Sequence, residues 1–196
     1  IILGIIIIFL AIWLGYSYYK KPVSNTEPIK IGAILPLSGG NAVFGEWIRN
    51  GIELALKDTG AENIQVMYED SQFDAKQGVS AFNKLVDVDK ADIIVSAMSS
   101  VSVPLIPLVK EKNKILMLQD VTYPNITKDN PLVFRHFIQS DREAEIISSY
   151  AFNNLGVKRV GILYINDESG VGARDAFTRI FKQKGGEISA VESFTG

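Results

Sequence analysis

Hydrophobic positions along this chain alternate between the spacing of a buried strand and the spacing of a helix. Residues 29–35 are mostly apolar, and Pro36, which has no N–H for a sheet ladder, ends the run. From Phe44 to Leu56 the apolar side chains recur at intervals of three or four residues. The pattern predicts a buried strand, a short polar loop and a helix.

The same alternation continues to the end of the chain. Helices are predicted after each strand, the later ones beginning near Ser102, Ser140 and Ala173, and Asp74 and Ser140 each open a capping-box pattern. Further strands are predicted at the apolar runs 64–69, 93–95, 115–118, 132–137, 160–165 and 188–194. Such alternation is typical of α/β folds with parallel sheets and right-handed crossovers.

The N-terminal segment has a different character. Residues 1–19 are almost wholly apolar and carry no charge, and about 20 such residues span a bilayer as a helix. A signal-peptide core, usually ~7–15 residues long, is the alternative, and a buried core helix is a third. Lys20 and Lys21 follow, and positive charges prefer the cytoplasm, which conflicts with export of the rest. We expect a transmembrane anchor or signal segment at 1–19 and a polar linker at 20–28.

Composition narrows the classes of function. Hydrophobic residues make up 47% of the chain and charged residues 21%, which is enough for a globular core. The net charge is −2 without a basic stripe, so a nucleic-acid partner is not expected. The absence of cysteine excludes disulfides, thiolate metal sites and a lipid-modified cysteine anchor in this sequence, and the single histidine, His136, argues against a histidine metal site.

Two polar loops follow predicted strands of the first sheet. Ser99 and Ser100 precede a helix, where hydroxyl and N–H groups suit a carboxylate, although a serine there can also simply cap the helix. Asp120 and Thr122 follow the strand at 115–118, and the Asp120 carboxylate could pair with an ammonium group or be a solvated loop acid. Loops at the carboxyl ends of parallel strands are where α/β proteins bind ligands.

Several catalytic motifs are incomplete in this sequence. Residues 40–45 have the glycine spacing of a phosphate-binding loop, but Glu46 stands where that loop needs its lysine. Ser99, His136 and Asp120 are the residue types of a hydrolase triad, without any spacing that fixes their geometry. We therefore expect a binding protein with no catalytic residues, no metal and no cofactor.

The opening of the globular part carries a family resemblance. The strand at 29–35 runs into Pro36-Leu-Ser-Gly39, an aromatic–glycine pair at Phe44-Gly45, and Asn50-Gly-Ile-Glu-Leu-Ala55. This series resembles the opening of the leucine/isoleucine/valine-binding protein family, the type 1 periplasmic solute receptors of ABC transporters. The likeness continues to the last residue, and it implies a two-lobed, Venus-flytrap fold with a parallel sheet in each lobe.

The resemblance also implies a division of the chain. Residues 29–138 correspond to the first lobe, and residues 139–196, which include a hinge crossing at Gln139 and Ser140, correspond to the start of the second. Members of the family are markedly longer, so we expect this chain to be an N-terminal fragment with a truncated second lobe.

Roles for individual residues follow from the resemblance as well. It implies that Ser99 or Ser100, together with Thr122, meets a ligand carboxylate. The backbone carbonyl of Asp120 would meet an amino group, although the family usually has Ser or Ala there. An aromatic at Phe44 packs on the ligand, and Ser169 replaces a tyrosine that closes over it in many members. With the serine of the first loop, the candidate ligand-binding residues are Ser38, Phe44, Ser99, Ser100, Asp120, Thr122 and Ser169.

The implied function is that of an extracytoplasmic solute-binding protein, either membrane-anchored or secreted. It would capture an amino acid or similar small ligand between two lobes and deliver it to an ABC permease. Two alternatives stay open: the ligand-sensing ectodomain of a receptor or regulator, and an amidase-type enzyme on an α/β scaffold.

Overall fold

The structure, a computed structural model, describes residues 27–195. The predicted anchor or signal segment at 1–19 and most of the linker at 20–28 lie outside the described residues. Within residues 27–195, no helix is both long enough and apolar enough to cross a membrane.

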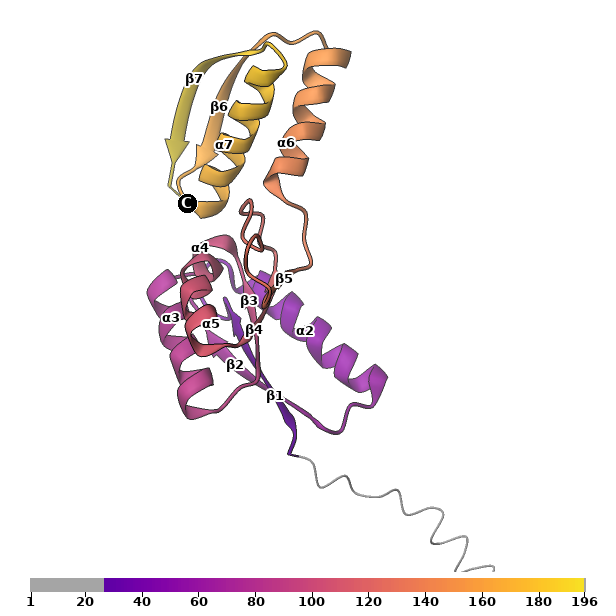
Figure 1. Ribbon diagram of the computed structural model, residues 1–196, viewed down its shortest axis with the longest axis vertical. Coiled ribbons are helices and arrows are strands. Elements are labelled where there is room, and N and C mark those ends of the chain that lie inside the picture. The colour runs from indigo at the N-terminus through magenta and orange to yellow at the C-terminus, as the bar shows by residue number, and fades with distance from the viewer. Residues whose placement is uncertain (1–26, 196) are drawn as a thin grey trace, which may run out of the picture.

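The first part of the described chain is built on five parallel strands in the order β2-β1-β3-β4-β5 (Figure 1). Apolar runs form these strands because both faces of the sheet are covered by helices. The strands are β1 (Ile29–Leu35), β2 (Ile64–Asp70), β3 (Ile93–Ala97), β4 (Ile115–Gln119) and β5 (Val133–Arg135). The predicted parallel α/β architecture is therefore confirmed.

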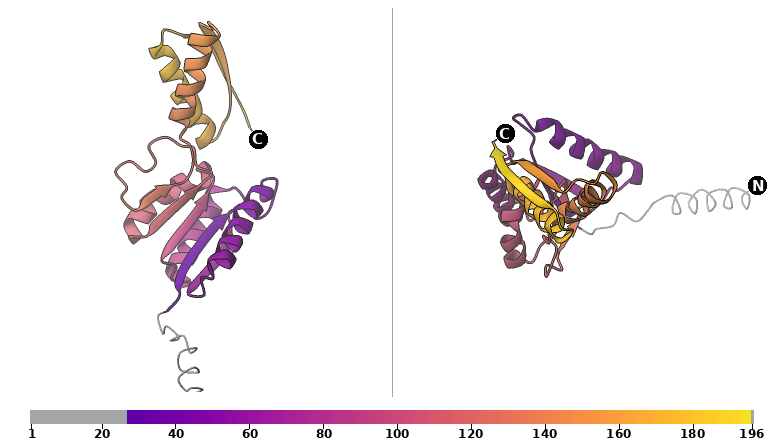
Figure 2. Two further views of the ribbon diagram at one scale, coloured as in Figure 1. Left: turned by 90° about the vertical axis from the view of Figure 1, so that its right-hand side faces the viewer. Right: turned by 90° about the horizontal axis from the view of Figure 1, so that it is seen from above.

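Helices lie on both faces of this sheet, and Figures 1 and 2 place α2 on one face and the others on the opposite face. Most of the buried core lies between the sheet and this second group, where Phe82, Leu105 and Val109 pack against Ile94 and Leu116. The helices are α2 (Ala42–Thr59), α3 (Ala75–Asn83) with the π-helical η1 (Lys84–Val88), and α4 (Ser99–Ser102), which continues through the 3₁₀ turn η2 (Val103–Leu105) into α5 (Ile106–Lys112).

The second part of the described chain is smaller and lies beyond the carboxyl edge of the first sheet (Figure 2). Two parallel strands form its sheet, α7 packs against the sheet, and α6 packs beside α7. Phe181 is fully buried there, stacked on Phe177 with ring centroids 5.3 Å apart. The elements are α6 (Ser140–Ser149) with the π-helical η3 (Tyr150–Asn154), β6 (Arg159–Ile165), α7 (Glu168–Gln183) and β7 (Glu187–Phe194).

Three predicted boundaries were wrong. The helix predicted from Ser102 begins at Ser99, and the helix predicted from Ala173 begins at Glu168, because Asp167 caps it by accepting a hydrogen bond from the Gly170 N–H. The strand predicted at 132–137 is only Val133–Arg135, since the chain then leaves the sheet and crosses to the second part.

The two predicted capping boxes differ in outcome. Asp74 caps α3, and its carboxylate accepts a hydrogen bond from the Gln77 N–H at 2.9 Å, as predicted. The box at Ser140 is wrong, because Ser140 is already helical, and its hydroxyl donates to the Thr122 carbonyl instead of accepting from a backbone N–H of its own helix.

Candidate functional site

The carboxyl ends of β1, β3 and β4 meet at the edge of the first sheet that faces the second part. Because β2 lies on one side of β1 and β3 on the other, the chain connections diverge between β1 and β3. This is the topological switch point at which open α/β sheets bind ligands. The segments that leave these strands carry Ser38 in the β1–α2 loop, Ser99 and Ser100 in the first turn of α4, and Asp120 to Thr122 in the loop after β4.

Ser99 and Thr122 meet at this edge. The Thr122 N–H donates a hydrogen bond to Ser99 Oγ at 3.3 Å, and Ser99 is only 3% exposed. Ser100 Oγ is buried and has no hydrogen-bond partner among the described residues. Buried hydroxyls are normally paired, so the unpaired Ser100 hydroxyl is an exception at this edge of the sheet.

The backbone around this pair is held in an uncommon conformation. Met98, immediately before Ser99, has φ +70°, and Asp120, two residues before Thr122, has φ +50°. Side chains with a β-carbon rarely adopt positive φ, and such residues cluster at ligand sites, where the surrounding structure enforces them. The Met98 N–H donates to the Gln119 carbonyl at 3.2 Å, which ties the ends of β3 and β4 together.

Asp120 is partly buried beside this pair. Burial raises the pKa of its carboxyl above the ordinary value, and the carboxylate makes no hydrogen bond or ion pair with any of residues 27–195. A carboxylate that is partly desolvated and unpaired gains from a cation or a hydrogen-bond donor brought to it.

Residues of the second part also contact Thr122. The hydroxyls of Thr122 and Ser169 are hydrogen-bonded at 2.7 Å. Both the N–H and the hydroxyl of Ser140 donate to the Thr122 carbonyl at 3.0 Å. Gly172 lies so close to this loop that a β-carbon there would be 2.9 Å from Cδ of Pro124. Thr122 therefore connects the first sheet with α6 and α7.

Ser38 lies at the same edge, but it hydrogen-bonds to Asp70 and not to Ser99 or Thr122. Its N–H and its hydroxyl donate to the carboxylate of Asp70, at the end of β2. Burial alone would raise the pKa of Asp70, but the hydrogen bonds from the Ser38 hydroxyl and from the N–H groups of Gln72, Leu37 and Ser38 outweigh it and lower the pKa. In the described chain Ser38 thus holds the β1–α2 loop.

Phe44 lies in the first turn of α2 and is 39% exposed. Its ring packs edge to face on Trp47 with centroids 5.5 Å apart. The exposed Phe44–Trp47 pair therefore presents aromatic surface at the start of α2.

Ser140 was not predicted to contribute to this site. Its position before an acidic first turn suggested a helix cap, which is why its contact with Thr122 was missed. The contact joins residues 18 apart across the crossing between the two parts, and no local sequence pattern encodes such a partner.

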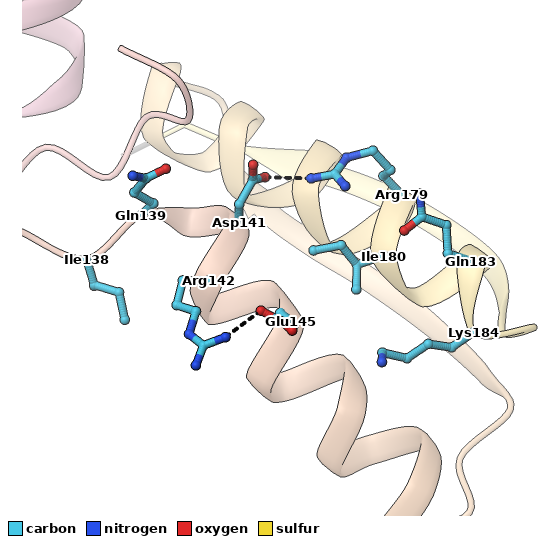
Figure 3. Close-up of a pocket in the computed structure, with 9 residues that line it drawn as sticks. All are labelled: Ile138, Gln139, Asp141, Arg142, Glu145, Arg179, Ile180, Gln183 and Lys184. Carbon is cyan, nitrogen blue, oxygen red and sulfur yellow. Dashed lines mark hydrogen bonds and ion pairs between the residues drawn. The ribbon is translucent and has the colours of Figure 1, made fainter. Parts of the chain in front are cut away.

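A cavity of about 760 Å³ lies apart from these residues, between α6 and α7 (Figure 3). Two ion pairs line it, Arg179 with Asp141 at 2.8 Å and Arg142 with Glu145 at 2.6 Å. Its lining includes none of the predicted ligand residues, and these four charges satisfy one another. No cluster of potential metal ligands occurs in the part of the chain that is described.

Comparisons with known proteins match most of the described chain. A family model described as periplasmic binding protein matches residues 28–195. A Leu/Ile/Val-binding protein of Rhizobium johnstonii is 30% identical over 163 residues, which are 80% of this chain and 44% of the relative. The chain therefore spans less than half the length of this relative.

Solved structures share the fold. A solute binding protein of an ABC transporter from Rhodopseudomonas palustris, in complex with 3,4-dihydroxybenzoic acid, has a TM-score of 0.78 at 24% identity, over 87% of this chain and 48% of that one. A branched-chain amino acid transporter substrate binding protein from Streptococcus pneumoniae, in complex with isoleucine, has a TM-score of 0.73 at 24% identity, over 86% of this chain and 50% of that one.

Proposed function

Because the chain belongs to the periplasmic binding protein family, as its sequence resemblance predicted, we propose that it binds a small carboxylate-bearing solute, most simply an amino acid, at the Ser99–Thr122 pair. This family consists of binding proteins rather than enzymes, which removes the amidase alternative. The observation that carries the proposal is the contact between Ser99 and Thr122 at the switch point of the sheet.

The carboxylate end of the ligand would be held by hydroxyl donors. Ser99, Ser100 and Thr122 provide three hydroxyls within one turn of helix and one adjoining loop, and Ser100 Oγ lacks a partner in residues 27–195. Hydrogen bonds to a charged acceptor contribute about 1.5–3 kcal/mol each, so a carboxylate gains more here than a neutral group does.

The ammonium end would be held at Asp120. Its carboxylate is partly buried, unpaired in the described chain and raised in pKa by that burial, so a cation beside it would relieve the desolvation. The alternative is that the backbone carbonyl of Asp120 accepts from the ammonium group and the carboxylate stays in solvent. Either arrangement selects a ligand with a positive charge next to its carboxylate.

The fold alone does not choose the ligand. The two solved structures share 24% identity with this chain, yet one holds an aromatic acid and the other isoleucine. Both ligands carry a carboxylate, which agrees with the hydroxyl cluster, and only isoleucine carries an amine. The acidic residue at Asp120 and the sequence relative named for Leu, Ile and Val binding favour the amino acid.

Closure of two lobes would complete the site. Ser169 and Ser140 reach Thr122 from the second part, so movement about the crossing at Gln139 and Ser140 would open and close the contacts around a ligand. In this proposal the protein lies outside the cytoplasm, as its family implies, and passes its ligand to an ABC permease. The same proposal assigns residues 1–19 to a membrane anchor.

The test is calorimetric titration of the full-length protein with L-leucine, L-isoleucine and 3,4-dihydroxybenzoate. We expect heat of binding with the amino acids and weaker or no binding of the aromatic acid, since that acid has no ammonium group for Asp120. Tighter binding of 3,4-dihydroxybenzoate than of either amino acid would contradict the proposed ligand class.

A further inference from the structure

Arg135, in strand β5, contacts the loop after β4 that carries Thr122. It is the last residue of β5 and pairs in register with Leu118 of β4. Its Nη1 donates to the Tyr123 carbonyl at 2.7 Å and lies 3.4 Å from the Val121 carbonyl. These two carbonyls belong to the residues on either side of Thr122, so one guanidinium nitrogen bridges the backbone of the proposed ligand loop.

The surroundings of Arg135 are unusual for a buried cation. Its side chain is partly buried, Nη2 is buried without a hydrogen-bond partner, and no carboxylate among residues 27–195 forms an ion pair with it. Burial accordingly lowers the pKa of its guanidinium. A desolvated charge without a counter-ion is destabilising unless its hydrogen bonds compensate for it, and here those bonds go to the loop at Thr122.

We propose that Arg135 is a positioning residue for ligand binding, which holds the backbone on both sides of Thr122 so that the Thr122 N–H and hydroxyl face Ser99 and Ser169. This inference rests on the proposed function for its effect on the ligand. Its effect on the loop is independent of any ligand.

The chemistry of the side chain explains why arginine occupies this position. The guanidinium is planar and presents its N–H groups in a fixed fork, so one nitrogen can serve two carbonyls in a set direction. The ammonium of lysine is a single, strongly hydrated point on a flexible stem. Arg135→Lys therefore keeps the charge and removes the bridge.

The first measurement is amide hydrogen exchange in the ligand-free chain. Arg135→Lys should raise exchange about tenfold at the amides of residues 121–123 and leave the amides of β1 and β3 unchanged. Arg142→Lys is the matched control, because Arg142 is exposed, pairs with Glu145 and does not contact the loop. Unchanged exchange at residues 121–123, or an equal rise throughout the first sheet, would overturn the proposal.

The second measurement is a double-mutant cycle on L-leucine affinity. If Arg135 acts through Thr122, Arg135→Lys should weaken binding about tenfold in the wild-type background and less than about twofold beside Thr122→Val. Equal losses in both backgrounds would show that Arg135 supports the fold in general, and would overturn the proposal. Arg135→Gln, which retains an N–H donor without the charge, replaces the lysine variant if the latter does not fold.

The two measurements separate this inference from the function on which it rests. If Thr122→Val alone leaves L-leucine affinity unchanged, or if L-leucine does not bind, the proposed carboxylate site is wrong. The exchange experiment still decides whether Arg135 holds the loop, because it uses no ligand.

Discussion

The hydroxyl oxygens of Thr122 and Ser169 lie 2.7 Å apart, although the two residues belong to different parts of the fold. Thr122 follows β4 in the first part, and Ser169 lies in the first turn of α7 in the second. Their hydrogen bond joins the two parts at the place where the sequence predicts a ligand carboxylate. A ligand that binds Thr122 must therefore share its hydroxyl with Ser169 or displace it.

A change at Asp120 should affect recognition of the ligand's ammonium group but not of its carboxylate. Asp120→Asn removes the negative charge, so L-leucine should bind about tenfold more weakly. The same change should hardly affect 4-methylpentanoate, which is leucine without its amine. Calorimetric titration with both compounds measures the difference. Equal affinity of wild type and variant for L-leucine would mean that Asp120 is a solvated loop acid and that its backbone carbonyl contacts the ammonium.

The effect of Asp120→Asn on the free energy of unfolding should depend on pH. Burial raises the folded pKa of Asp120 above its unfolded value, so charging the carboxylate opposes folding. That penalty is absent below the unfolded pKa, near ~3.9, and grows as the pH rises through the folded pKa. Asp120→Asn should therefore be at least as stable as wild type at neutral pH, measured by urea unfolding. A less stable variant at neutral pH would contradict an unpaired carboxylate.

Asp70 should behave in the opposite way. Hydrogen bonds from the β1–α2 loop lower its pKa despite partial burial, so it stabilises the fold above its unfolded pKa and loses this effect as the pH falls through the folded pKa. Asp70→Asn should cost about 0.5–1 kcal/mol at neutral pH, a modest value because the site is screened by solvent. The difference should shrink on acidification. The matched control is Asp58→Asn, on the exposed surface of α2.

Two glycines of α2 should respond oppositely to the same substitution. A β-carbon at Gly45 would overlap the carbonyl oxygen of Pro36, whereas one at Gly51 would meet open space. Gly45→Ala should therefore destabilise by about 1–3 kcal/mol, and Gly51→Ala should stabilise by roughly 0.5–1 kcal/mol through helix propensity. Urea midpoints at an unchanged slope would measure both. Effects of the same sign would show that α2 does not approach Pro36 as described.

Exchange protection should differ between the two parts of the chain. In the first part β3 lies between two paired neighbours, and Ala33, Ile34 and Ile94 are fully buried. In the second part nearly every residue of β7 is exposed. Amides of β1 and β3 should therefore exchange more slowly than those of β6 and β7. Equal protection in the two sheets would contradict this distribution of burial.

Much of the fold could be predicted because buried strands carry a strong apolar signal. The runs that became β1, β2 and β4 were located to within a residue or two, since strands covered by helices on both faces need apolar residues on both. The runs of β6 and β7 were located equally well, although much of both strands is exposed. Helix starts were less predictable. The helix predicted from Ala173 begins five residues earlier, so Gly170 and Gly172 lie in the first turns of α7, where the close approach of Ile165 and Pro124 leaves no room for a side chain.

The candidate site was predictable only where it depends on strand ends. Ser99 and Thr122 follow β3 and β4, and parallel strands bring such loops together. Ser140 and Arg135 were missed because each hydrogen-bonds a backbone carbonyl of the Thr122 loop. Every residue has a backbone carbonyl, so the tertiary fold alone determines which carbonyl a side chain bonds. The pattern of side chains along the sequence does not indicate it.

The carboxylate site is tested most directly by titrating L-leucine into Thr122→Val and Thr122→Ser. Valine has nearly the shape of threonine without the hydroxyl, and serine retains the hydroxyl without the methyl group. We predict that Thr122→Val weakens binding by roughly tenfold to a hundredfold, the loss of about 1.5–3 kcal/mol expected for one hydrogen bond to a charged acceptor. Thr122→Ser should stay close to wild type. Wild-type affinity in Thr122→Val would contradict a carboxylate held at Thr122.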